Sequence, residues 1–65
     1  MNIIEGIQQE SDRVRTIIAE YEKIPAGGLA AELMKVTIKQ SEIAVAMGDT
    51  IAMISMYEEL KGFEL

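Results

Sequence analysis

The stretch "IPAGG", from Ile24 to Gly28, constrains the fold most strongly, because it holds the only proline of the chain and its only pair of adjacent glycines. Proline disfavours helical geometry in the residue before it, and glycine readily adopts the positive φ angles of tight reversals. Apolar residues with helical spacing occur on both sides of the stretch. The sequence therefore predicts a turn over residues 25–28 that joins two helices as a hairpin, with positive φ at the glycines.

The segment before the turn predicts an amphipathic helix over about residues 3–24. Its apolar residues recur every three or four positions, which places them on one helical face. Glu10 falls inside this apolar stripe, and we expect its carboxylate to reach water at the edge of the stripe. The members of the stripe are Ile3, Ile7, Val14, Ile17, Ile18, Tyr21 and Ile24.

The segment after the turn predicts a second helix over about residues 29–47, and this helix is apolar on more than one face. Its charged residues are confined to one narrow wedge, which is typical of a helix that is covered on several sides. One apolar stripe consists of Leu29, Leu33, Val36, Ile43 and Met47, and the other of Ala30, Met34, Ile38 and Val45.

Gly48 and Asp49 separate this helix from a third one, which is predicted over about residues 50–61. Glycine suits the end of a helix, and an aspartate is a favourable N-cap for the next. The short tail from Gly62 to Leu65 is expected to fray; the alternative is that the side chains of Phe63 and Leu65 dock back. The predicted fold is all-α, with a helical hairpin and a third helix in one domain over residues 1–65.

The size and composition of the chain predict self-association. A domain of 65 residues buries only roughly 60% of the surface of its unfolded chain, and small scaffolds gain stability from disulfides, metals or oligomerisation. This chain has no cysteine and no histidine, while 49% of its residues are hydrophobic. We therefore expect an oligomeric helical bundle, with Gln40 pairing across a symmetric interface. The expected interface residues are Leu33, Met34, Ile38, Gln40, Ser41 and Val45.

The same composition argues against several classes of function. Without histidine or cysteine the chain lacks the commonest general base and the usual zinc ligands, and its serines have no histidine partner. We assign no catalytic, cofactor-binding or metal-binding residues and expect a protein that is not an enzyme. The net charge of −5 opposes nucleic-acid binding. No apolar run approaches the roughly 20 residues of a membrane span, and the N-terminal segment does not resemble a secretory signal, so we expect a cytoplasmic protein.

The start of the second helix has two alternative interpretations. The amides of a helix N-terminus can bind an anion, and this predicts a possible ligand site formed by Tyr21, Lys23, Gly27 and Gly28. No phosphate-binding loop or dinucleotide fingerprint is present, however. The other interpretation is that these residues form only a turn.

The segments "RVRTIIAEYEKIPAGGLAAELM" (Arg13 to Met34) and "AMGDTIAMISMYEELK" (Ala46 to Lys61) resemble small helical accessory proteins encoded by phages and prophages. The resemblance implies a non-enzymatic role. The first function that we expect is a homo-oligomeric helical module that binds or blocks a host protein, and the acidic charge favours it. The alternative is an oligomeric binder that sequesters a small anionic ligand such as a signalling nucleotide.

Overall fold

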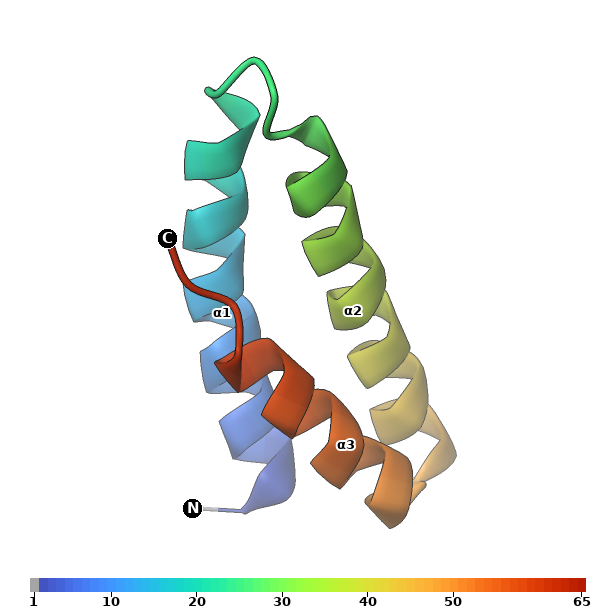
Figure 1. Cartoon of the computed structure of the whole chain (residues 1–65). Coiled ribbons are helices and arrows are strands. Elements are labelled where there is room, and N and C mark those ends of the chain that lie inside the picture. The colour runs from blue at the N-terminus through green and yellow to red at the C-terminus, as the bar shows by residue number, and fades with distance from the viewer. Residues whose placement is uncertain (1) are drawn as a thin grey trace.

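A computed structural model describes residues 2–65 as three α-helices: α1 (Ile3–Glu22), α2 (Gly28–Met47) and α3 (Thr50–Lys61). Helices α1 and α2 form a long antiparallel hairpin, and α3 folds back across the half of the hairpin that is farther from its turn (Figure 1). The predicted all-α fold is confirmed, since residues 2–65 contain no strand. The predicted helix bounds agree with the structure except at the hairpin turn, where α1 ends two residues earlier and α2 begins one residue earlier.

The turn between α1 and α2 does not use positive φ angles, so that part of the prediction is wrong. Gly27 has φ −88° and ψ −5°, and Gly48 is the one residue with positive φ in the described part of the chain. Two consecutive tight turns reverse the backbone instead: the amide of Ile24 donates to Tyr21 O at 3.1 Å and the amide of Gly27 to Ile24 O at 2.9 Å. Glycine is required at position 27 because a Cβ there would overlap the carbonyl oxygen of Tyr21.

Local capping fixes the other helix ends. Asn2 Oδ1 accepts a hydrogen bond from the amide of Glu5 at 2.8 Å, and Asp49 Oδ1 accepts one from Ala52 at 3.1 Å. These side chains satisfy amides that have no partner within the helix. Gly48 ends α2 in the left-handed conformation, with φ 66°, which a residue without a Cβ adopts at little cost. The chain can therefore leave α2 and start α3 within two residues.

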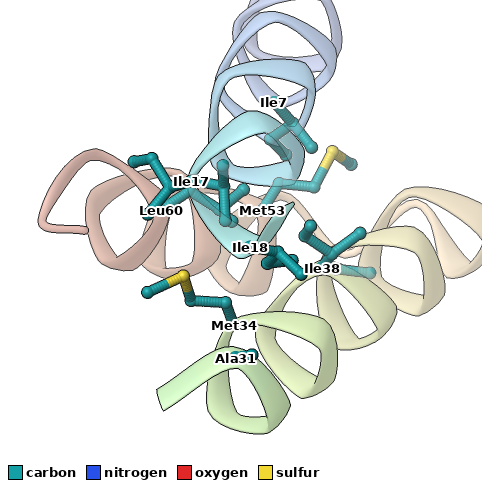
Figure 2. Close-up of a cluster of buried hydrophobic side chains, with 10 residues drawn as sticks. Ile7, Ile17, Ile18, Ala31, Met34, Ile38, Met53 and Leu60 are labelled. Carbon is teal, nitrogen blue, oxygen red and sulfur yellow. The ribbon is translucent and has the colours of Figure 1, made fainter. Parts of the chain in front are cut away.

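The core lies between the three helices. Figure 2 shows side chains from all of them meeting in one cluster. Helix α2 contributes the stripe that contains Met34 and Ile38, and Val14 and Leu60 are fully buried. Burying a large aliphatic side chain stabilises a fold by about 1.5–3 kcal/mol, so this cluster supplies most of the stability of the single chain. The buried apolar residues are Ile7, Val14, Ile17, Ile18, Ala31, Met34, Ile38, Ala44, Met53 and Leu60.

Arg13 of α1 holds the C-terminal end of α3. Its Nη2 donates to Leu60 O and its Nη1 to Phe63 O, each at 2.8 Å. The last carbonyl groups of a helix have no partner within it and carry partial negative charge, so a guanidinium is a suitable donor there. Arg13 Nε also lies 3.0 Å from Glu10 Oε1. Glu10 therefore does not simply reach water, as we expected; it completes an ion pair beside the end of α3.

The C-terminal tail docks back through Phe63 but not through Leu65, so the alternative to a frayed end holds for one of the two side chains. Phe63 is half-buried and packs against the core, and the hydroxyl of Tyr21 donates to Glu64 O at 3.2 Å. Glu64 and Leu65 are exposed. The tail thus lies along α1, as the red end of the trace in Figure 1 shows.

Replacing Arg13 tests how strongly this contact holds α3. In an Arg13→Met variant Phe63 O loses its guanidinium donor, while Leu60 O keeps the amide of Phe63 at 3.2 Å. We expect the free energy of unfolding to fall by about 1–3 kcal/mol. Urea denaturation followed by circular dichroism, at one fixed protein concentration, measures the change. Arg15→Met is the matched control, because Arg15 pairs only with the exposed Asp12, and such a change usually costs less than about 0.5 kcal/mol. Equal effects of the two substitutions would contradict the proposed role of Arg13.

The two glycines of the turn should respond differently to alanine. Gly27→Ala places a methyl group against the Tyr21 carbonyl, so we expect a lower melting temperature than in the wild type. Around Gly28 a Cβ would meet no atom within 4 Å, and removing a glycine from the first turn of a helix stabilises a protein by about 0.4–1 kcal/mol. Calorimetry of both variants checks this, and a Gly27→Ala protein as stable as the wild type would show that the turn relaxes freely.

Candidate binding surface

The outer face of α2 carries a line of apolar side chains that the rest of the chain leaves uncovered. Leu29 is 85% exposed and Met47 76% exposed, and the apolar residues between them on this face are about half exposed. Gln40 lies in the same line and is also exposed. We call these six residues the outer stripe: Leu29, Leu33, Val36, Gln40, Ile43 and Met47.

The geometry of a helix explains why this stripe stays outside. Two residues further along an α-helix, a side chain points about 200° round the axis. Met34 and Ile38 are buried against the other helices, so Val36 between them must point away from the core. Helices α1 and α3 both pack on the inner side of α2 (Figure 1), and no described segment lies over the outer stripe.

The structure divides the six residues that the sequence assigned to an oligomer interface. Leu33 and Gln40 are exposed and belong to the outer stripe. Of the other four, Val45 is half-buried against the core, and the rest are buried, namely Met34, Ile38 and Ser41. Met34 and Ile38 pack against α1 and α3 of the same chain, whereas Ser41 and Val45 also line the groove between α1 and α2. The surface that α2 leaves open for a partner is the outer stripe.

The four predicted ligand residues lie close to the hairpin turn, but most of them already have partners. Tyr21 Oη donates to the tail, Lys23 Nζ lies 3.5 Å from Glu20 Oε1, and Gly27 is buried under the Tyr21 carbonyl. Gly28 is exposed and begins α2. The N-terminus of α2 has no side-chain cap and no acidic residue in its first turn, so its amides are the part of this predicted site that stays open.

The charges near the turn are largely neutralised within the chain. Lys35 Nζ lies 2.7 Å from Glu22 Oε2, and this hydrogen bond, with the attraction of the same carboxylate, raises the pKa of Lys35. Lys23 faces Glu20 in the same region. Because each of these lysines has an acidic neighbour, the turn does not carry a concentrated positive potential.

A shallow groove of about 420 Å³ runs between α1 and α2, away from α3. Its floor includes the small buried side chains Ser11 and Ser41, and its rim carries Asp12, Arg15 and Glu42. Asp12 and Arg15 form an ion pair at 2.8 Å. The groove thus has one acidic group in excess and does not attract anions. Its lining is Ile4, Ile7, Gln8, Ser11, Asp12, Arg15, Ser41, Glu42 and Val45.

The polar side chains of residues 2–65 form no arrangement that indicates a metal site or an unsatisfied buried group. They contain no group of three or more acidic side chains placed to hold a metal ion. Every buried polar side-chain atom in this part of the chain has a hydrogen-bond partner; for example, Ser41 Oγ donates to Ile38 O at 2.6 Å. Within the same residues, no helix has the length and apolar character needed to cross a membrane. The outer stripe is therefore the surface feature that most requires an explanation.

Comparison of this chain with protein families, curated proteins and solved structures found no match. Its function is therefore inferred from the side chains and geometry described above. The sequence did contain a signal for the outer stripe, namely the apolar residues at alternating four- and three-residue intervals. What it lacked was a sign that this stripe, and not the one with Met34 and Ile38, is the outer one.

Proposed function

We propose that this protein is a non-enzymatic, homo-oligomeric helical binding protein that uses the outer stripe of α2 to contact its partners. The observation that best supports this proposal is a line of exposed apolar side chains along one face of α2, formed by Leu29, Leu33, Val36, Ile43 and Met47. These five side chains are 44% to 85% exposed, and large exposed apolar patches mark interaction sites. Burial of this patch would also relieve the marginal stability of so small a domain.

A non-enzymatic role is supported by how the buried hydroxyl groups are used. Thr37 Oγ1 donates to Leu33 O at 3.0 Å and Ser41 Oγ to Ile38 O at 2.6 Å, so both are engaged by the backbone of their own helix. A serine or threonine nucleophile needs a neighbouring base and access to substrate. These hydroxyls stabilise the packing of α2 instead.

A host protein is the partner class that the charge and the resemblance favour for the assembled exterior. Eleven acidic residues against six basic ones would attract a basic protein surface by long-range steering. The resemblance to phage and prophage accessory proteins points to the same kind of role, in which a small acidic module blocks a host component.

The second candidate function is the sequestration of a small anionic ligand such as a signalling nucleotide. It is favoured by the open amides at the N-terminus of α2, where a side-chain cap and acidic residues are lacking. Lys23 and Lys35 lie on either side of the turn and would add charge. The acidic partners of these two lysines, Glu20 and Glu22, oppose this function, so it ranks second.

Replacing isoleucine by glutamate at either of two positions of α2 tests the proposal. Ile43 is 49% exposed in the outer stripe, whereas Ile38 is 6% exposed in the core. We expect Ile43→Glu to stay helical but to dissociate into monomers, because the charge would lie in the interface. Ile38→Glu should unfold the chain, because it buries an unpaired charge. Light scattering and circular dichroism on the same samples distinguish these outcomes.

A wild-type protein that is monomeric at all concentrations would contradict the homo-oligomeric assembly. A folded Ile43→Glu protein that keeps the wild-type mass would instead show that the assembly uses another surface.

A thermal-shift screen against nucleoside mono-, di- and triphosphates and cyclic nucleotides tests the second candidate. A ligand at a hundred times its dissociation constant adds about 2.7 kcal/mol of stability, which for so small a protein raises the melting temperature by roughly 10–20 °C. Lys23→Glu and Lys35→Glu variants should lose the shift if the ligand lies at the turn. Unchanged melting temperatures across the whole panel would argue against nucleotide binding and favour protein binding as the function.

A further inference from the structure

We propose that the partner of the outer stripe is a second copy of this chain, with the two α2 helices parallel and in register, so that Gln40 of one copy contacts Gln40 of the other. This inference rests on the proposed function and specifies the partner and its orientation. It is drawn from the spacing of the stripe, its two flanks and its one polar member.

The spacing of the outer stripe is that of a coiled-coil seam. Successive members lie four, three, four, three and four residues apart from Leu29 to Met47. A repeat of 3.5 residues keeps a line of side chains facing one partner helix over several turns. An α-helix that packs only by ordinary amphipathicity carries a wider apolar face. The narrow line therefore fits one helix of matching spacing, and α2 of a second copy has that spacing.

The flanks of the stripe favour the parallel orientation. One flank consists of Ala30, Thr37 and Ala44, which lie against the body of the same chain, and the other carries Glu32 and Lys39, which are exposed. In a parallel pair each exposed flank meets the uncharged flank of the other copy. In an antiparallel pair with full overlap, exposed flank meets exposed flank, and Lys39 of one copy comes close to Lys39 of the other. Like charges in that position are unfavourable.

Gln40 favours the same orientation. In a parallel in-register pair its amide lies beside an identical amide, and each can donate to and accept from the other. In the antiparallel arrangement with full overlap Gln40 lies opposite Val36, which leaves the amide without a partner in an apolar layer. An unpaired buried polar group costs about 1–3 kcal/mol. A single polar layer of this kind sets register and orientation in helix pairs.

The two copies also have room for this arrangement. Helices α1 and α3 both lie to the inner side of α2 (Figure 1). The flank with Ala30 and Thr37 is the one that is covered within the chain. A two-fold axis parallel to the helices places the two bodies on opposite sides of the seam. The groove between α1 and α2 contains none of the stripe residues, so it stays available to other partners.

Disulfide trapping tests the register directly, because the natural chain has no cysteine and each introduced thiol is unique. A Gln40→Cys variant should form a covalent dimer on mild oxidation, since facing positions in a parallel seam meet the distance requirement of a disulfide. Gln9→Cys is the matched control, as Gln9 is an exposed glutamine on α1. We expect cross-linking at position 40 to be at least about tenfold faster, because the assembly holds those thiols at high effective concentration. Circular dichroism and light scattering establish that both variants keep the wild-type fold and mass.

Three results would overturn the proposal in distinguishable ways. If a mixture of Gln40→Cys and Val36→Cys chains gives mainly the mixed disulfide, the helices are antiparallel. If Gln40→Cys cross-links no faster than Gln9→Cys while the wild type is an oligomer, the assembly stands but uses another surface. If the wild type is a monomer at all concentrations, the homo-oligomeric function and this inference both fail.

Discussion

The rest of the structure depends on one constraint, which is that α2 is apolar on two sides while the chain has only two other helices to cover it. Helices α1 and α3 both pack on the side with Met34 and Ile38, because a shared core of three helices buries more apolar area than two separate contacts. That choice leaves Leu29, Val36 and Met47 in water. The cost of exposing them is the physical basis for expecting a partner.

The chain has no cysteine with which to form a disulfide, and Arg13 is central to how its small core is closed. Helix α3 has only 12 residues, and isolated helices of that length are marginal in water. The guanidinium of Arg13 joins the carbonyl end of α3 and its tail to α1, while Glu10 balances its charge. A short helix is thus held by packing along its length and by polar contacts at its end. The outer stripe of α2 is consequently presented on a fixed scaffold.

Self-assembly and the binding of a small anion require different kinds of surface on this protein. The outer stripe is apolar and narrow, which suits a helix and not a small charged ligand. The open amides at the start of α2 suit an anion, but acidic side chains accompany the nearest lysines. The outer stripe begins at Leu29, in the same first turn of α2 whose amides are open. An oligomer that forms through the stripe would therefore repeat these amide ends around its axis.

The sequence by itself determined the helix limits to within two residues, the caps at Asp49 and Gly48, and the presence of two apolar stripes on α2. Helical periodicity and capping act over a few neighbouring residues, so they can be recognised without the fold. Only the tertiary structure decided which stripe is inside, since that depends on where α1 and α3 pack. For the same reason, three residues that the sequence assigned to an oligomer interface lie in the core of the single chain, namely Met34, Ile38 and Ser41. The tertiary structure likewise decided that Glu10 pairs with Arg13 beside Leu60 of α3, which is 47 residues from Arg13 along the chain. It also decided that Gly27 is needed for close approach and not for positive φ. Contacts between distant segments leave no local periodicity from which they could be predicted.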